Sequence, residues 1–188
     1  MRFFGKFLRR PGRVGSVVPS SRYLAEAMVA DLELVSGDVI IEYGPGTGPM
    51  TAVLASQLPA GVRYLGIERD AQFQHLLEAR FPHLDFHLGS VEDVADILRT
   101  RELPKAKAII SGLPFASLPV ELQQSIAHET REVLSEAGEF RTFQYVHAYR
   151  LPAARRFRAA MEDVFGSYSR SQPVLRNVPP AYVLTYKP

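Results

Sequence analysis

The stretch Val39-Ile40-Ile41-Glu42-Tyr43-Gly44-Pro45-Gly46-Thr47-Gly48 decides the fold of this chain. It opens with an apolar run between Gly37-Asp38 and Gly44-Pro45, which is typical of a buried strand. The glycines that follow let the backbone turn sharply and approach a ligand closely. Residues 50–58 then show a helical pattern, so the whole stretch predicts a strand, a glycine loop and a helix.

The rest of the chain repeats this alternation. Further strands are predicted at residues 62–67, 84–88, 106–110 and 140–146, and helices at residues 23–34, 71–81, 91–98, 118–134 and 152–165. Such alternation gives a mostly parallel sheet with helices on both faces. Two last strands, near residues 168–175 and 181–186, have no helix between them, which predicts one antiparallel strand. We therefore predict an α/β, Rossmann-like domain with a seven-stranded sheet.

The composition excludes several kinds of site. The 188 residues include no cysteine, which excludes disulfides, zinc–thiolate sites, iron–sulfur clusters and cysteine nucleophiles. No run of about 18 apolar residues occurs, so no segment is expected to span a membrane. The histidines show no ligand spacing with carboxylates, so no metal site is proposed. The first ten residues lack the apolar core of a secretory signal. The absence of cysteine fits a cytoplasmic location.

The net charge of +2 hides a strong asymmetry along the chain. The residues before Glu26 carry +6, residues 26–140 carry −10, and the residues from Arg141 onward carry +6. Basic ends on an acidic middle indicate an anionic partner, either lipid head groups or nucleic acid. The alternative is an unevenly solvated surface.

A second acidic residue indicates an adenosine-containing ligand. Glu68 ends the second predicted strand, 20 residues after Gly48, where a carboxylate suits the hydroxyls of a ribose. Ligands of open parallel sheets bind at the carboxyl ends of the strands. A dinucleotide is the alternative, but the glycine spacing differs from G-x-G-x-x-G. Glu42 would also repel a pyrophosphate, whereas it suits a ligand with an ammonium and a sulfonium group.

The glycine loop together with Glu68 resembles the S-adenosylmethionine (SAM) site of class I methyltransferases. A closer resemblance, to bacterial phospholipid N-methyltransferases, rests on three stretches: Gly15-Ser16-Val17-Val18-Pro19-Ser20, Ser111-Gly112-Leu113-Pro114-Phe115 and Arg176-Asn177-Val178-Pro179-Pro180-Ala181. The similarity covers nearly the whole chain. Related enzymes, the ribosomal RNA adenine dimethyltransferases, share the glycine loop but carry Asn-Leu-Pro-Tyr where this chain begins at Ser111.

The resemblance implies a role for each part of the cofactor site. The methionine end of SAM is held by the segment that contains Glu42, Tyr43, Gly44, Gly46 and Gly48. Glu68 binds the ribose, with Arg69 beside it, and Ser90 and Val91 flank the adenine. The family usually has Asp at the position of Ser90, so Glu92 is the alternative contact. The product would be S-adenosylhomocysteine.

We call residues 111–114 the lip, because the resemblance implies that Ser111, Gly112, Leu113 and Pro114 bring the target amine to the methyl group. Pro114 lacks an N–H and biases Leu113 toward an extended backbone. Carbonyls of the lip can then orient an amine and tolerate developing positive charge. Phe115 is expected to add an aromatic face for a methylated ammonium. The alternative is a plain strand-to-helix turn.

Two residues at the end of the fifth strand are candidate proton acceptors or relays. The attacking amine must be neutral, although a primary ammonium loses its proton only near pH 10 in water. Tyr145 and His147 are placed to help, and a half-buried strand end without a role in the reaction is the alternative.

The leading hypothesis is therefore an enzyme that methylates the amine of phosphatidylethanolamine with SAM, on the route to phosphatidylcholine. An RNA adenine N6-methyltransferase is the runner-up. It is disfavoured because Ser111 replaces a side-chain amide, and because 188 residues leave no room for the appended helical domain of that family. A SAM-binding protein without catalysis is the third hypothesis. The oligomeric state is left open.

The N-terminal segment has its own pattern. In a helix, Phe3, Phe4, Phe7 and Leu8 would lie on one side and the basic residues on the other. Such a helix binds in the interface of an anionic membrane. We therefore predict a membrane-binding arm at residues 1–20 and a methyltransferase domain at residues 21–188, in a protein held peripherally on the inner face of the cell membrane. A hydrophobic clasp on the domain is the alternative for the arm.

Overall fold

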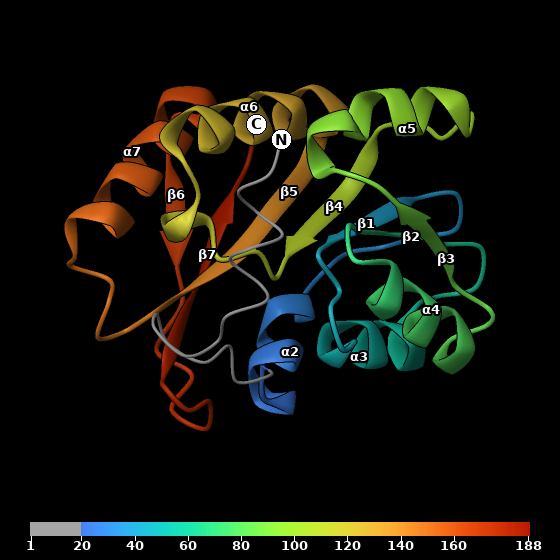
Figure 1. The fold of residues 1–188 in the computed structure, drawn as a ribbon, viewed down its shortest axis with the longest axis horizontal. Helices are drawn as coiled ribbons and strands as arrows, with labels where there is room; N and C mark the ends of the chain where they lie inside the picture. Colours follow the sequence, from blue (N-terminus) through green and yellow to red (C-terminus); the bar gives the residue numbers. More distant parts are fainter. Residues whose placement is uncertain (1–19) are drawn as a thin grey trace.

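Seven strands form one sheet across residues 20–188, the part of the chain that the computed structural model describes. Their order is β3-β2-β1-β4-β5-β7-β6 (Figure 1). The strands are β1 (Val39–Tyr43), β2 (Arg63–Glu68), β3 (Asp85–Leu88), β4 (Ala106–Ser111), β5 (Leu134–Tyr145), β6 (Tyr168–Arg170) and β7 (Ala181–Tyr186). Of these seven, β7 runs antiparallel to its neighbours and the others are parallel to one another. The predicted sheet is confirmed.

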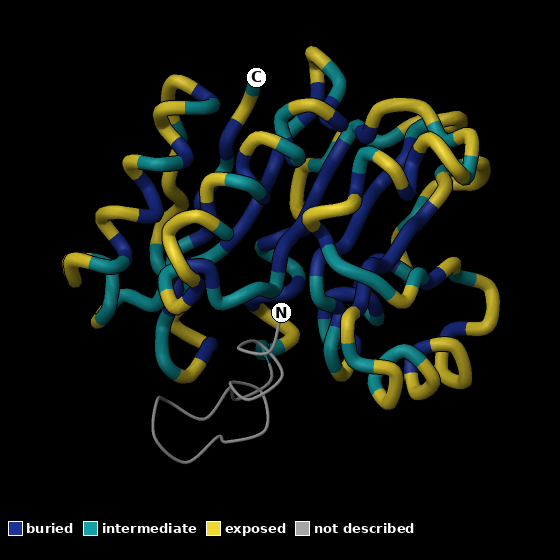
Figure 2. The backbone as a smooth tube through the Cα atoms, turned by 45° about the horizontal axis from the view of Figure 1, so that its top comes forward, coloured by how far each residue is buried: buried dark blue, intermediate teal, exposed yellow. Residues whose placement is uncertain are grey.

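Helices cover both faces of this sheet, as predicted (Figure 1). One face carries α2 (Arg22–Val29), α3 (Pro49–Gln57) and α4 (Ala71–Arg80), and the other carries α5 (Val94–Thr100), α6 (Val120–Val133) and α7 (Pro152–Phe165). Figure 2 shows buried strands between helices whose outer sides are exposed. Residues of β1 alternate between the two cores, since Ile40 joins the α2–α4 cluster and Ile41 joins the α5–α7 cluster. The chain is a three-layer α/β domain.

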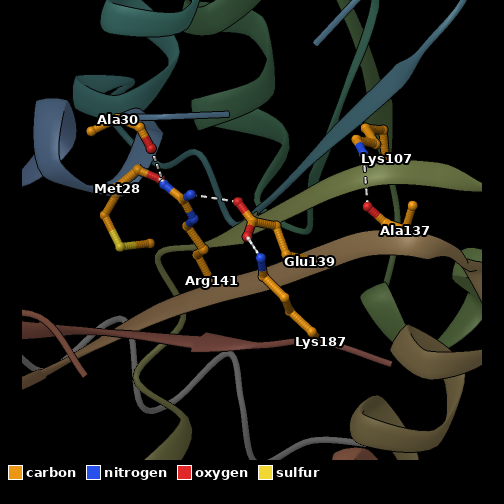
Figure 3. A network of polar contacts seen from close by, with 7 residues as sticks. All are labelled: Met28, Ala30, Lys107, Ala137, Glu139, Arg141 and Lys187. Atoms are coloured by element: carbon orange, nitrogen blue, oxygen red, sulfur yellow. Dashed lines mark hydrogen bonds and ion pairs between the residues drawn. The ribbon is translucent and has the colours of Figure 1, made fainter. Parts of the chain in front are cut away.

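The first described helix is shorter than predicted. α2 begins after the N-cap Ser21, but it ends at Val29 and not at Leu34. Arg141 of β5 donates its Nη1 to the carbonyls of Met28, at 3.2 Å, and Ala30 (Figure 3). The last carbonyls of a helix lack N–H partners within the helix, and here the buried guanidinium of Arg141 donates to them in place of a further helical turn. Glu139 pairs with Arg141 and balances its charge.

Two strand boundaries also differ from prediction. β5 starts at Leu134, directly after α6, so Gly138 lies inside a strand and does not end the helix. An added Cβ at Gly138 would lie 2.9 Å from Leu134 Cγ and the Ser135 carbonyl oxygen in the same strand and 3.0 Å from the Ala106 carbonyl oxygen of β4, so the crowding of both strands explains this glycine. β6 ends at Arg170 and not near Leu175, since the chain then enters a loop that contains Pro173.

Only some of the apolar residues around α4 face the core. Leu77 and Phe81 are buried and Phe73 is partly buried, whereas Leu76 is exposed. The buried face follows the four-residue spacing of the other three residues, and Leu76 lies about 100° away from Leu77 around the helix axis.

The structure bears on the predicted membrane contact only in part. Among residues 20–188, no helix is long and apolar enough to cross a membrane. The predicted N-terminal amphipathic arm lies outside the described residues.

Candidate active site

The candidate site lies at the carboxyl edge of the sheet, where the loops after β1, β2 and β4 meet. The Gly112 N–H donates to the Tyr43 carbonyl at 3.0 Å, and the Gly44 N–H donates to the Ile67 carbonyl at 2.9 Å. These bonds continue the parallel ladders beyond the strand ends. The glycine loop and the lip are therefore fixed against each other by the backbone.

The glycines of the loop serve different purposes. Gly44, Gly46 and Gly48 have φ of 63°, 59° and 81°, a region that side chains disfavour. An added Cβ at Gly44 would lie 2.6 Å from Leu113 Cδ2, so this glycine makes room for the lip. At Gly46 the nearest such atom is the Gly44 carbonyl oxygen, at 3.9 Å. Gly46 thus presents backbone that a ligand can approach closely.

Glu68 lies at the end of β2 with its carboxylate held by backbone N–H groups. Its Oε2 accepts from Gly46 at 2.9 Å, and its Oε1 accepts from Arg69 at 2.8 Å and Asp70 at 2.9 Å. A carboxylate has roughly four acceptor positions, so capacity remains for a ribose hydroxyl. The bond to Gly46 ties the predicted ribose-binding residue directly to the glycine loop.

Glu42 is almost fully enclosed, with 1% of its surface exposed. Its Oε2 accepts from Thr51 Oγ1 at 2.8 Å and from Tyr64 Oη at 2.7 Å. Burial raises the pKa of Glu42 to about 7; the two hydroxyls lower the pKa, and the charge of Glu68 raises it. Near neutral pH this carboxyl is partly protonated, and a cationic ligand group beside it would favour its ionised form.

The two partners of Glu42 were not found from the sequence. Thr51 lies in the first turn of α3, and Tyr64 lies on β2. Glu42 pairs in register with Gly66, where an added Cβ would lie 2.8 Å from Tyr64 Oη. The glycine therefore leaves the space through which the tyrosine hydroxyl reaches the carboxyl. A glycine inside a predicted strand, two residues after a tyrosine, was the available signal.

The predicted adenine contacts lie in the loop after β3, which the Gly89 N–H joins to the Glu68 carbonyl at 2.9 Å. Ser90 caps the short 3₁₀ helix η1 (Val91–Asp93), and its Oγ lies 3.3 Å from both the backbone nitrogen and Oε2 of Glu92. The two alternative adenine contacts, Ser90 and Glu92, are therefore neighbours. Val91 is buried and packs into the α5–α7 core.

The lip closes over the glycine loop. Ser111 is fully buried, and its Oγ accepts from the Leu113 N–H at 3.2 Å, so its side chain shapes the turn. An added Cβ at Gly112 would lie 3.2 Å from the Gly44 carbonyl oxygen. Pro114 precedes the 3₁₀ helix η2 (Phe115–Ser117). The structure thus brings Gly112 and Leu113 of the predicted lip against the predicted cofactor loop.

Two aromatic side chains belong to the core. Phe115 was expected to offer its face to the site, but it is 3% exposed and stacks on Phe157 of α7 at 5.0 Å. It therefore anchors the lip from behind. Tyr43 is also fully buried, with its hydroxyl accepting from Thr130 Oγ1 at 3.3 Å. Tyr43 can contribute to a cofactor site only through its backbone.

Tyr145 and His147 lie together at the end of β5. Their rings are nearly parallel, with an interplanar angle of 13° and centroids 5.7 Å apart. Partial burial raises the pKa of Tyr145, so its phenol stays protonated at neutral pH. His147 is exposed. The two rings stack on each other, and the role of the pair as a proton relay stays a prediction.

These residues fit an adenosine cofactor. Glu68 supplies a carboxylate at the end of β2, and Gly46 supplies open backbone bonded to that carboxylate. The loop that carries Ser90 is joined to the same residue, Glu68.

Within residues 20–188, no group of three His, Cys, Asp or Glu side chains is placed to hold a metal ion.

Comparison with known sequences adds two relatives, although no protein-family model matches the chain. Over 182 residues the chain is 34% identical to the ornithine lipid N-methyltransferase of Singulisphaera acidiphila, covering 95% of this chain and 91% of that protein. It is 31% identical over 101 residues to a ribosomal RNA small subunit methyltransferase of Arabidopsis thaliana, covering 54% of this chain and 28% of that protein.

Comparison with solved structures finds the same fold. A TehB-like SAM-dependent methyltransferase from Corynebacterium glutamicum superposes with a TM-score of 0.63 and 14% identity, over 97% of this chain and 94% of the other. Fibrillarin from Aeropyrum pernix, solved with bound SAM, gives a TM-score of 0.63 and 14% identity, over 88% of this chain and 75% of the other.

Proposed function

Because the chain belongs to the family of the ornithine lipid N-methyltransferase and has the class I methyltransferase fold, we propose that it transfers methyl groups from SAM to the amine of a membrane lipid. The relative that spans 95% of the chain is the observation that carries this proposal. The contact between the lip and the glycine loop supports it, because methyl transfer needs a target group and a cofactor at one edge.

The residues at this edge have distinct roles in holding the cofactor. Glu68 would accept from the ribose hydroxyls, and Gly46 would let the backbone approach the methionine end. An ammonium group beside Glu42 would favour the ionised form of this carboxyl, with Thr51 and Tyr64 donating to it. When bound, SAM supplies an electrophilic methyl group on a sulfonium.

The lip positions the lipid amine. Carbonyls of Ser111 and Gly112 orient the amine and stabilise its developing positive charge. Leu113 covers Gly44 and keeps water out. The hydroxyl of Tyr145 accepts a hydrogen bond from the neutral amine. After methyl transfer the new ammonium releases one proton, and the exposed His147 accepts that proton through solvent. Burial favours the neutral amine that the reaction needs.

Two lipid substrates are candidates. Phosphatidylethanolamine is the substrate predicted from the sequence, and ornithine lipid is the substrate named for the relative. Each carries a primary amine near an anionic group. Incubation with labelled SAM and vesicles that contain one lipid at a time separates them. Label in the phosphatidylethanolamine fraction supports the first, and label only in ornithine lipid would transfer the proposal to the second.

RNA is the weaker alternative. The Arabidopsis ribosomal RNA methyltransferase matches only 54% of this chain, and the chain spans 28% of its length. Ser111 also lacks the side-chain amide of the RNA enzymes, and here its hydroxyl is turned to the lip backbone. The basic ends of the chain are then contacts for an anionic bilayer, with residues 1–20 as an anchor.

A further inference from the structure

The loop between β6 and β7, residues 171–180, presents two large apolar side chains to solvent. Leu175 and Val178 are 72% and 76% exposed, the highest values among the large hydrophobic residues of the described chain. Tyr23 of α2 is 46% exposed. Its ring lies 4.9 Å from the guanidinium carbon of Arg176, which places α2 beside the loop. Figure 1 shows the loop projecting beyond the sheet.

Hydrogen bonds hold this loop in shape. The Asn177 side chain is buried, accepts from the Ser21 N–H at 2.9 Å and donates to the Pro179 carbonyl at 2.7 Å. The Val174 N–H donates to the Ala181 carbonyl at 2.8 Å. Leu175 lies two residues before the buried Asn177, and Val178 directly follows it. The hydrogen bonds of Asn177 therefore fix the loop conformation that turns both apolar side chains outward.

The loop stands at the same edge of the sheet as the candidate active site. β7 is antiparallel to β5, and Ala181 at its start pairs with Tyr145 at the end of β5. The Val146 N–H donates to the Pro180 carbonyl at 2.8 Å. A surface that binds this loop would therefore lie against the edge where the lip and the glycine loop meet.

The charge around the loop favours an anionic surface. No acidic residue occurs among residues 166–180, whereas Arg176 lies within the loop and Arg170 directly precedes it. The nearest charge on α2, Arg22, is paired with Glu26 at 2.7 Å. Apolar tips with an adjacent arginine and tyrosine match the layers of a bilayer interface, where aromatic and basic side chains lie at head-group level.

We infer that residues 171–180 insert Leu175 and Val178 into an anionic bilayer, with Tyr23 and Arg176 at the head groups. This inference rests on the proposed function, since it places the active-site edge against the membrane that holds the lipid substrate. It adds a contact within the folded domain to the predicted N-terminal arm. Loss of both apolar tips should weaken vesicle binding ~10-fold or more, from the area each side chain buries.

The absence of tryptophan from the chain allows a direct test. Leu175→Trp in the full chain gives a single tryptophan, which is excited selectively over the eight tyrosines. Its emission is observed with vesicles of phosphatidylglycerol and phosphatidylethanolamine whose acyl chains are brominated. We expect a blue shift and quenching. Val35→Trp is the matched control, since Val35 is 64% exposed and precedes β1 at the opposite edge; its emission should not change.

Three results would overturn the inference. These are unchanged Leu175→Trp emission in protein that sediments with the vesicles, an emission already blue-shifted without lipid, and failure of the full chain to bind. The first means that another surface makes the contact, and the second that another part of the chain covers the loop.

A second variant separates this inference from the proposed function. Leu175→Ser with Val178→Ser should lose methylation of vesicle lipid and keep methylation of detergent-dispersed lipid, with unchanged SAM affinity as the check on folding. Equal rates on vesicles for this variant and the natural chain would contradict the inference. If the natural chain methylates neither lipid form, the proposed function fails, and the tryptophan emission still decides the role of the loop.

Discussion

Glu42 shows how one buried carboxyl can link stability to pH. Burial raises its pKa from 4.5 to about 7. Between these two values the folded chain holds a proton that the unfolded chain has released. The free energy of unfolding therefore falls as pH rises from about 4.5 to 7 and is level above that range. The full effect of this group is about 3 kcal/mol.

Glu42→Gln should remove this pH dependence. The amide oxygen can still accept from Thr51 and Tyr64, but it cannot ionise. Chemical denaturation should show that the free energy of unfolding of the natural chain falls between pH 5 and pH 8. The same fall should be smaller in the variant by about 3 kcal/mol. Glu78→Gln, on the exposed side of α4, is the control. The same loss in all three proteins would mean that other groups cause it.

Glu68 is the residue on which the cofactor assignment depends most. Glu68→Ala should weaken SAM binding by about 1.5–3 kcal/mol, because charged hydrogen bonds to the ribose and to Gly46 are lost. Calorimetry measures this affinity, with Glu78→Ala as a control for general effects of removing a carboxylate. Unchanged affinity in both Glu68→Ala and Glu42→Ala would remove SAM from this site.

The sequence could predict the residues of this site that lie at strand ends and in the glycine loop. It could not predict the side chains that form hydrogen bonds with them. Glu42, Gly46 and Glu68 follow from strand ends and glycine spacing. Thr51 and Tyr64 became visible only through the register of β1 and β2. The prediction that Phe115 faces the site was wrong, because the residues near it in the sequence do not show that α7 packs over its ring.

Among the larger elements, the lip is the segment whose role is most open to test. Pro114→Ala should lower kcat roughly 2–5-fold, because a lip that gains backbone freedom must be ordered again in the transition state. SAM affinity should stay nearly the same, since Pro114 lies on the side of the target amine. Pro119→Ala, at the start of α6, is a matched proline control. Parallel losses of thermal stability and SAM affinity would show the lip to be structural only.

The boundaries of the helices and strands could be predicted from the local sequence pattern only in part. Apolar runs and turn residues predicted β1, β4, α7 and β7 to within one residue. The end of α2 depends on Arg141, which lies 111 residues beyond Ala30 in the chain. The start of β5 was missed because α6 passes directly into the strand with no turn residue between them. Boundaries set by distant side chains carry no local signal.

For the whole molecule, the separated charges predict salt-sensitive binding to anionic vesicles. Each Lys or Arg near such a surface contributes about 1 kcal/mol. Removal of residues 1–10 takes away four basic residues, so vesicle sedimentation should weaken while SAM binding is kept. α7 also carries three arginines, at positions 155, 156 and 158, but it is a poorer anchor, because Arg158 is buried and donates to Gln144 at 2.6 Å. Full sedimentation of the shortened protein would exclude the arm as an anchor.

Lipid N-methylation by SAM is the central claim for the molecule as a whole, and one competition experiment tests it most directly. The full chain is incubated with labelled SAM, vesicles that contain phosphatidylethanolamine, ornithine lipid and phosphatidylglycerol, and ribosomal RNA in the same tube. Lipid and RNA are then separated and analysed by mass spectrometry. We predict label on the lipid amine, none on phosphatidylglycerol, and a strong reduction with Glu68→Ala. Label on RNA adenine, or no transfer to any lipid amine, would contradict the account.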